Sequence, residues 1–452
     1  MKSFNNEQKN NLLKEYYIDN KTFLIVTIIS SSLILLTAIL IIILLTTSTN
    51  TLYEDEEILR GYILVNSITA KYRIEDTNKP VLLYNNKYTN MIHTIRINGE
   101  KINEVKNEYI FPPKGEYEVK LSIKKALKRT DEFFIDCDRL IEVNFVNLIS
   151  DRIKNSSGMF YNCNNLEAIN FTNFYIDDLT NISNMFYNCT SLSSVDLSNF
   201  SGNKLQDISS LFYNCHNLTY INFDSFYTRY VTNMSYLFYS CESLNELNLI
   251  FSTENVQDMS HMFQGCYNIN NISQDFNTEN VLYMNNMFDG CENLSSIDLY
   301  NFTTNKVTNM SYMFNDCKNL EILNFSISNL DSIKDMSFMF SNCEKIQDID
   351  LFNLSTINLN NISYMFNNCS NLTSLNMTNF LTDNVINMSH LLYNCENLNY
   401  IDFSSFNTLK ASDYDNIFDG LPENGTFVYN GKTFTISDKI PATWIKKDTS
   451  NN

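Results

Sequence analysis

Eleven cysteines recur at an almost constant spacing along this sequence, and they are the first residues to consider for chemistry. Successive cysteines lie 26 residues apart, except in the two intervals on either side of Cys266, which are 25 residues long. A metal site needs two or more Cys or His ligands at short spacing, whereas each interval here supplies one cysteine. The spacing therefore predicts no metal site. The cysteines are Cys137, Cys163, Cys189, Cys215, Cys241, Cys266, Cys291, Cys317, Cys343, Cys369 and Cys395.

The same spacing limits how the cysteines pair. A fixed period of this length is typical of a solenoid. In a stack of repeats with strands ~4.8 Å apart, neighbouring Cα atoms lie within disulfide range, but parallel side chains in register point the same way. An odd total of 11 cysteines also argues against a complete disulfide framework. We therefore predict buried free thiols that fill a column of the core; disulfides between some pairs are the alternative.

Seven residues after each cysteine, nearly every repeat carries Asn or Asp, and these residues are expected to face outward from a strand. Two interpretations stay open: a ladder of side-chain hydrogen bonds between repeats, and a calcium site built from carboxylate and amide oxygens. The acids are interleaved with Asn and no D-x-D-x-D-G loop occurs, which favours the ladder. Ser273 breaks the column in a 25-residue interval, which indicates a bend, a local site or repeat drift. The column is Asn144, Asn170, Asp196, Asn222, Asn248, Ser273, Asp298, Asn324, Asp350, Asn376 and Asp402.

Two neighbouring columns, five and nine residues after the cysteine, mix polar residues with large apolar ones. Exposed aromatic residues on a strand face are suited to contact a protein or a glycan. Scattered surface aromatics are also normal in proteins that bind nothing there. With two acids from the column between them, these residues form the candidate ligand-binding set: Tyr220, Ile250, Tyr300, Ile322, Phe352, Tyr400, Asp298 and Asp350.

Residues for enzyme chemistry are sparse. The four histidines share no spacing that sets up a catalytic triad or a metal site. With only 10 glycines, the chain has no phosphate-binding glycine loop. We expect a protein that is not an enzyme and carries no cofactor. The histidines are His93, His216, His261 and His390.

Each cysteine sits between two elements that must position these residues. In Val231–Phe251, apolar residues occur seven, four and three positions before the cysteine, a spacing that predicts one face of a short helix. Asn or Asp eight positions before the cysteine is suited to cap that helix. Leu244, Leu247 and Leu249 then follow the L-x-x-L-x-L spacing of a leucine-rich-repeat strand. The predicted fold class is α/β, a leucine-rich-repeat solenoid with about 26-residue repeats of one short strand and one short helix.

The wording of the repeat also resembles a known family. Val231–Leu249 fits the pattern V-T-N-M-S-x-M-F-x-x-C-x-x-L-x-x-L-x-L closely, and it resembles the BspA-like leucine-rich repeat of surface proteins. The same pattern is carried by Tyr312–Phe314, Cys317 and Leu320. The resemblance covers roughly residues 131–424, and it implies a role in adhesion or recognition.

Four segments lie outside the repeats. Residues 1–22 are polar and form a tail, whereas 23–45 carry no charge. As a helix of ~35 Å the second segment is long enough to cross a bilayer. Residues 51–130 predict a small all-β module, and 425–452 a β cap over the open core. Lysines precede the uncharged segment and Glu54–Glu57 follow it, so the N-terminus is expected in the cytosol.

Charge narrows the class of partner. The whole chain has a net charge of −19, and residues 137–452 carry 14 basic against 34 acidic residues. Such a field repels phosphate backbones, so nucleic acid is not an expected partner of the repeats. Together, the architecture and the resemblance to BspA-like surface proteins imply a single-pass plasma-membrane protein whose extracellular repeats bind a protein or glycan. The alternatives are a structural surface-coat or antigenic protein without a dedicated ligand, and an intracellular membrane-tethered scaffold of the opposite topology.

Overall fold

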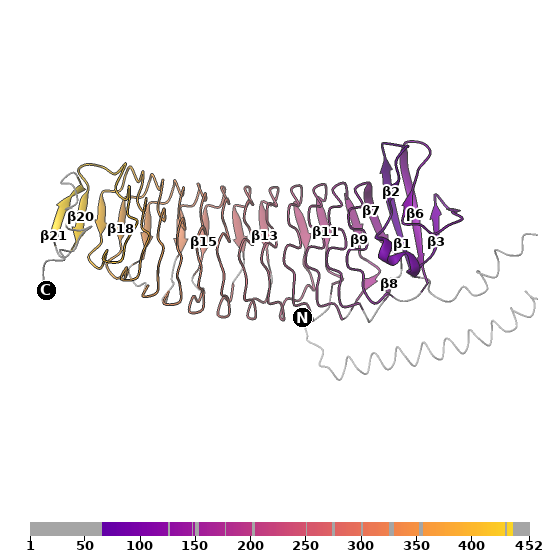
Figure 1. Cartoon of the computed structure of the whole chain (residues 1–452), viewed down its shortest axis with the longest axis horizontal. Helices are drawn as coiled ribbons and strands as arrows, with labels where there is room; N and C mark the ends of the chain where they lie inside the picture. The colour runs from indigo at the N-terminus through magenta and orange to yellow at the C-terminus, as the bar shows by residue number, and fades with distance from the viewer. Residues whose placement is uncertain are drawn as a thin grey trace, which may run out of the picture. The chain divides into compact units, whose positions relative to one another are not determined.

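The computed structural model describes residues 66–436, with short gaps. The predicted tail, 1–22, and the predicted membrane span, 23–45, lie outside the described residues. Within those residues, no helix is long and apolar enough to cross a membrane. They belong to one compact unit, Val65–Asn452, in which a β module leads into a row of stacked turns (Figure 1). The gaps are 125–126, 147, 150–152, 177, 201–203, 250, 274–275, 300–301, 325–329, 352–355 and 430–431.

A six-stranded sheet, in the order β4-β3-β6-β1-β7-β9, occupies the N-terminal part of the described chain. β1 pairs antiparallel with β7, and β7 pairs parallel with β9, so one sheet passes from the module into the first turns. A separate pair, β2 and β5, lies outside that sheet. The elements are β1 (Ser67–Ile74), β2 (Val81–Leu82), the 3-10 helix η1 (Asn86–Met91), β3 (Ile92–Ile97), β4 (Glu100–Lys101), β5 (Glu108–Tyr109), β6 (Gly115–Ile123), β7 (Leu140–Phe145) and β9 (Ala168–Asn170).

The solenoid strands are short and parallel. The sequence predicted one short strand after each cysteine. From β11 to β19 each such strand has three residues, five to seven positions after the cysteine. β19 pairs with β20, and β20 forms an antiparallel hairpin with β21 at the end where a β cap was expected. The strands are β8 (Leu148–Ile149), β10 (Phe174–Tyr175), β11 (Ser194–Asp196), β12 (Tyr220–Asn222), β13 (Glu246–Asn248), β14 (Asn271–Ser273), β15 (Ser296–Asp298), β16 (Ile322–Asn324), β17 (Asp348–Asp350), β18 (Ser374–Asn376), β19 (Tyr400–Asp402), β20 (Thr426–Tyr429) and β21 (Lys432–Thr435).

The predicted helix of each turn is wrong, and the fold class is corrected from α/β to a β-solenoid. Among the described residues of 131–424 no helix occurs. Before Cys241, the residues Tyr236 and Ser240 have φ angles of +57° and +52°. A left-handed residue at every fourth position is incompatible with an α-helix, whose φ angles are all negative.

Consecutive backbone turns replace the helix. The N–H groups of Tyr236, Phe238 and Ser240 donate to carbonyls of the next repeat, with N···O distances of 3.0, 2.9 and 2.7 Å. The N–H groups between them bond three residues back within the same repeat, as that of Tyr239 does to Tyr236 at 3.2 Å. An α-helix has no donors to spare for such bonds, because its N–H groups bond four residues back. Alternate donors of this segment thus hold one repeat to the next.

The residues expected to cap the helices form Asx turns instead. Oδ1 of Asn233 accepts a hydrogen bond from the N–H of Ser235 at 3.0 Å. The same column makes a ladder of single parallel bridges that runs from Asn155 to Asp413. Asn and Asp therefore act as local acceptors for a backbone N–H, as a cap would, but the segment that follows continues into turns.

The apolar face itself was predicted correctly. Met234, Leu237 and Phe238 are fully buried, like the equivalent residues of other turns. The phenylalanines three positions before each cysteine form one stack from Phe134 to Phe366, with neighbouring ring centroids 5.4–5.8 Å apart. Rings offset at this separation attract one another. The period seen in the sequence is thus the period of a continuous core.

Candidate recognition surface

The strand face of the solenoid carries an outward column, defined as the residues five positions after each cysteine. The middle residue of a strand, such as Ile221, is buried, so the residues on either side of it point away from the core. In this column Tyr220, Ile322 and Tyr400 have 62%, 59% and 39% of their surface exposed. The alternation of the strand predicted this exposure; a role in binding stays a prediction.

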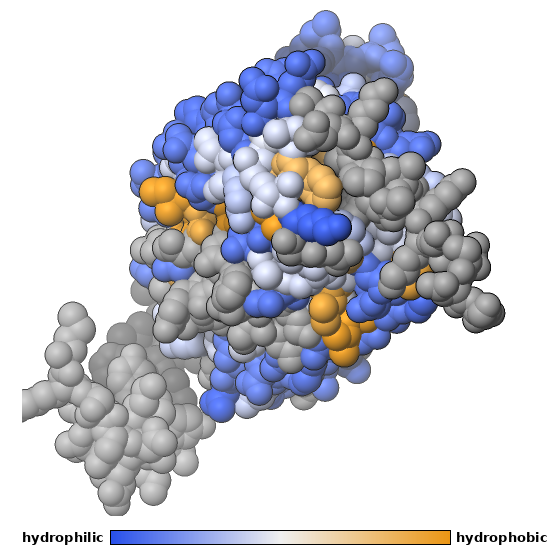
Figure 2. Space-filling model, turned by 90° about the vertical axis from the view of Figure 1, so that its left-hand side faces the viewer, coloured by the Kyte–Doolittle hydropathy of each residue, from blue (hydrophilic) through white to orange (hydrophobic). Residues whose placement is uncertain are grey.

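These apolar residues do not form one patch. Tyr220 lies on β12 and Ile322 on β16, four turns further along, which corresponds to ~19 Å at the usual strand spacing. Polar residues such as Glu246 and Ser296 occupy the column between them. At the C-terminal end of the molecule, too, hydrophobic residues appear as separate patches among hydrophilic ones (Figure 2). The strand face therefore offers spaced apolar contacts along a polar ribbon.

The remaining candidates fall into two groups. Asp298 ends β15 with an exposed side chain, and Asp350 ends β17. The other three predicted contacts lie outside the described residues: Ile250, Tyr300 and Phe352. The sequence reasoning missed further exposed apolar residues away from the outward column, because no alternation marks their turns. They are Tyr227, Tyr230, Tyr267, Tyr283, Ile357, Ile386 and Leu409.

The column seven positions after the cysteine does not form the expected ladder where the structure describes its contacts. Oδ1 of Asp196 accepts from the N–H of Ser198, and Asp402 bonds Ser404 in the same way, both at 2.9 Å. Each side chain therefore closes its own strand with an Asx turn. Across the described residues no group of three His, Cys, Asp or Glu side chains is placed to hold a metal ion.

A ladder between repeats does exist, one position before the cysteine. Asn368 donates to Asn342 at 2.7 Å, and Asn394 donates to Asn368 at 3.0 Å. These asparagines have φ angles of +57° to +60°, a conformation that Asn tolerates. Glycine takes the place of the ladder residue at Gly265 and Gly290, one position before the cysteines that end the two 25-residue intervals.

The cysteines are buried free thiols, as predicted. Each thiol from Cys163 onward donates to the carbonyl of the stacked phenylalanine in the preceding turn; Cys291, for example, lies 3.2 Å from the carbonyl oxygen of Phe263. Burial raises the pKa of Cys266 to about 12. The thiolate is the nucleophilic form, so we expect these buried cysteines to react slowly in the folded chain. A small side chain with a weak donor suits this position because it fills the core and reaches a carbonyl.

A half-buried polar cluster, here called the central cluster, spans the turns of the two 25-residue intervals and the turn that follows them. Its carboxylate, Asp289, accepts hydrogen bonds from three neutral amides: Gln264 at 2.8 Å, Asn286 at 2.9 Å and Asn315 at 2.8 Å. Burial raises the pKa of Asp289, and the amides offset only part of that effect. The members are His261, Gln264, Asn285, Asn286, Asp289 and Asn315.

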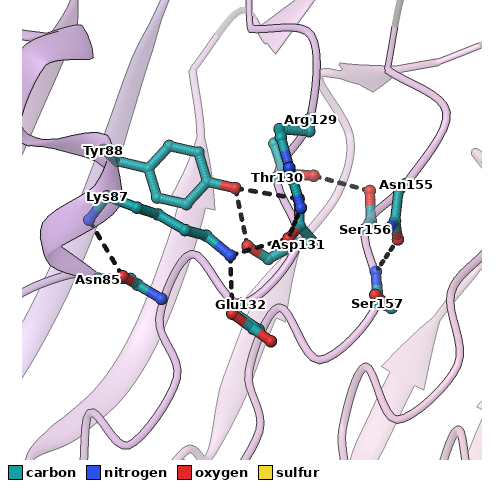
Figure 3. Close-up of polar contacts among 10 residues, drawn as sticks. All are labelled: Asn85, Lys87, Tyr88, Arg129, Thr130, Asp131, Glu132, Asn155, Ser156 and Ser157. Carbon is teal, nitrogen blue, oxygen red and sulfur yellow. Dashed lines mark hydrogen bonds and ion pairs between the residues drawn. The ribbon is translucent and has the colours of Figure 1, made fainter.

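A second polar cluster, the junction cluster, joins η1 to the first turn of the solenoid (Figure 3). Asp131, with 5% of its side chain exposed, pairs with Arg129 and with Lys87, whose Nζ lies 2.8 Å from Oδ2. The hydroxyl of Tyr88 donates to the backbone carbonyl of Asp131 at 2.7 Å. Burial opposes ionisation of Asp131, but hydrogen bonds from Arg129 and Lys87 outweigh it and hold its pKa below the usual value. Its contacts give the cluster a structural role. Lys87 also pairs with Glu132.

Two solved structures are similar to this chain at low identity. A leucine-rich repeat protein from Bacteroides ovatus ATCC 8483 is 20% identical, with 71% of this chain and 82% of that chain covered and a TM-score of 0.31. The complex of TLR13 with ssRNA13 is 14% identical, with 61% and 48% covered and a TM-score of 0.21. No curated protein matches.

A family model, in contrast, matches the repeats throughout. The family is described as "Mycoplasma protein of unknown function, DUF285", and its model matches residues 130–250, 248–348 and 334–432. These matches cover more than half of the chain and follow its stacked turns. The chain, a leucine-rich-repeat-like solenoid, thus belongs to the DUF285 family.

Proposed function

We propose that this protein is a recognition protein whose strand face binds an extracellular protein or glycan. The observation that carries the proposal is the outward column, in which side chains of successive turns stand exposed at a regular spacing. Tyr220, Ile322 and Tyr400 supply large apolar contacts, and polar neighbours supply hydrogen-bonding groups. Interfaces draw most of their binding energy from a few such large side chains.

Two further arguments support this proposal, and both come from the sequence. The resemblance of the repeat to BspA-like surface proteins implies adhesion or recognition. The strong negative charge of residues 137–452 disfavours nucleic acid. Display at the plasma membrane, through residues 23–45 and with the repeats outside, is part of the proposal. A C-terminal tag that stains on intact cells would support that topology, and a tag that stains only after permeabilisation would contradict it.

The binding proposal is tested with cells that display the full chain, probed with a glycan microarray and with immobilised extracellular-matrix proteins. The test variant combines Tyr220→Ala, Ile322→Ala and Tyr400→Ala. Because these side chains are exposed, the fold should persist while binding falls by about tenfold or more, since interface residues that matter cost over ~1 kcal/mol each. The matched control combines Tyr230→Ala, Ile357→Ala and Leu409→Ala, which removes equally exposed apolar groups from outside the column.

The competing function is a surface coat or antigen without a dedicated ligand. That function predicts that the cells bind neither the glycans nor the matrix proteins, or that both triple variants lose binding equally. Loss confined to the strand-face variant supports recognition through the outward column. Circular dichroism and thermal melting of all three proteins separate lost binding from lost folding.

A further inference from the structure

A cleft of about 550 Å³ opens in the β module, away from the solenoid's outward column. Its walls come from the β3–β4 hairpin, the segment after β4, and residues of β5 and β6. Pockets of ~300–1,000 Å³ are the size that proteins use for small organic ligands. The strand-face proposal leaves this cleft unexplained.

One wall of the cleft is aromatic. Tyr109 and Tyr117 both line it, and the buried ring of Phe111 packs against each of them, with centroid distances of 4.9 and 4.6 Å. Phe111 therefore fixes the position of both tyrosines. The face of an aromatic ring carries partial negative charge, which attracts the weakly positive C–H groups of a ligand.

The rest of the lining carries polar groups, several of them held in place by hydrogen bonds. Asn98, with a φ angle of +49°, and Gly99 make the turn between β3 and β4, and Oδ1 of Asn98 accepts from the N–H of Glu118 at 2.9 Å. The amide nitrogen of Asn98 thus remains to donate to a ligand. The hydroxyl of Tyr117 donates to the carbonyl of Pro113 at 3.0 Å, so its oxygen remains to accept.

The charges on the rim balance. Glu100 and Lys101 are exposed neighbours of opposite sign, and Asn103 beside them is neutral. A cleft without net charge gives no electrostatic preference to a phosphate, a carboxylate or a cation. The lining combines aromatic rings with amide and charged groups. A ligand that matches it has an uncharged ring with an apolar C–H face and hydroxyl groups along its edge.

We propose that this cleft is a second binding site, which takes a neutral oligosaccharide. The C–H face of a sugar ring stacks on Tyr109 and Tyr117. Its hydroxyl groups bond to the amides of Asn98 and Asn103 and to the charged rim. Proline-rich peptides also bind aromatic grooves, but they lack the hydroxyl edge that the polar groups of the lining would recognise.

The test is saturation-transfer-difference NMR on the full chain with maltotriose, cellotriose and chitotriose, each at about 10 mM, where even a millimolar Kd gives a signal. We expect at least one trisaccharide to bind. Tyr109→Ala should weaken that binding by about tenfold, as the loss of a key aromatic contact does. Asn103→Ala, a change of an exposed loop residue, should weaken it without affecting the fold.

Two controls make the result decisive. Tyr227→Ala removes an exposed tyrosine of the solenoid and should leave trisaccharide binding unchanged. The strand-face triple variant should also keep it, which separates this site from the outward column. The proposal is overturned if no trisaccharide binds, if Asn103→Ala and Tyr109→Ala bind like the wild type, or if a proline-rich decapeptide binds the cleft and the sugars do not.

Discussion

Two carboxylates in this protein, the buried Asp131 and the half-buried Asp289, sit in opposite electrostatic settings. Asp131 in the junction cluster faces two cations, Arg129 and Lys87. Asp289 in the central cluster faces neutral amides, with the acid Asp316 nearby. The first pKa is lowered and the second is raised, although burial pushes both upward.

The comparison shows that burial alone does not decide whether a carboxylate stabilises this fold. Cations stabilise the charged form of Asp131 by more than burial disfavours it, so ionisation strengthens the folded state. Amides stabilise the charge of Asp289 less, so ionisation weakens the folded state there. The junction thus uses its charge to hold η1 against the first turn, whereas the central cluster carries a charge at a cost to stability.

Removing the charge of Asp131 should have the largest effect. Asp131→Asn leaves Arg129 and Lys87 without their shared partner, and we expect the free energy of unfolding to fall by about 2 kcal/mol. Full burial of the pair would give a larger loss, but Arg129 and Lys87 have 61% and 33% of their side chains exposed, so water can solvate them. Guanidinium chloride denaturation of both proteins at neutral pH measures the difference.

The matched control for that change is Glu132→Gln. Glu132 also pairs with Lys87, at 2.7 Å, but 48% of its side chain is exposed. An exposed ion pair is worth little, so the loss should stay below about 0.5 kcal/mol. Equal losses for the two variants would show that the junction is an ordinary surface cluster and that the comparison with Asp289 fails.

Acid should remove the advantage of Asp131. Because its folded-state pKa lies below the unfolded value, its contribution is fully present above the unfolded pKa of ~3.9 and is lost as pH falls through the folded pKa. The stability difference between the wild type and Asp131→Asn should therefore shrink below about pH 4. Denaturation curves of both proteins between neutral pH and pH 3 test this. A difference that stays constant would mean that Asp131 acts through packing and not through its charge.

The sequence predicted those features of the fold that depend on periodicity. One short strand per repeat, the buried thiols and the inward apolar face that includes Phe238 all follow from the spacing. The predicted helix was wrong because consecutive turns also place inward-facing residues at intervals of three and four. Left-handed positions carry Tyr236, Tyr312 and Phe338, and such residues give no sign of a positive φ in the sequence.

The candidate site was predictable to the same extent. Strand alternation indicates that Tyr220 and Tyr400 face outward. Alternation cannot tell which asparagines bond to one another. Asn occurs both seven positions after the cysteine, in the column of Asp196, and one position before it, in the column of Asn368. The central cluster was signalled only by the 25-residue intervals, since three of its bonds join residues of different turns whose types are unremarkable in sequence.

The smallest expected effect is the sharpest test of the comparison. In Asp289→Asn the half-buried charge is gone, which stabilises the fold, but one amide donor loses its acceptor, which destabilises it by about 1 kcal/mol. We expect a free energy of unfolding within about 1 kcal/mol of the wild type at neutral pH.

The direction of its pH dependence should then be opposite to that of Asp131→Asn. The folded-state pKa of Asp289 is raised, so the folded protein binds a proton between the unfolded pKa of ~3.9 and the raised value, and the wild type gains stability as pH falls through that window. Asp289→Asn lacks this gain and should become less stable relative to the wild type on acidification. His261 and Asp316 are ionisable neighbours of the same carboxylate, so His261→Gln and Asp316→Asn are measured alongside. If the gain in stability on acidification disappears in His261→Gln or Asp316→Asn but persists in Asp289→Asn, the proton binds elsewhere in the cluster. If Asp289→Asn shows the same trend as Asp131→Asn, neutral amides stabilise a buried charge as well as cations do, and the distinction between the two clusters is lost.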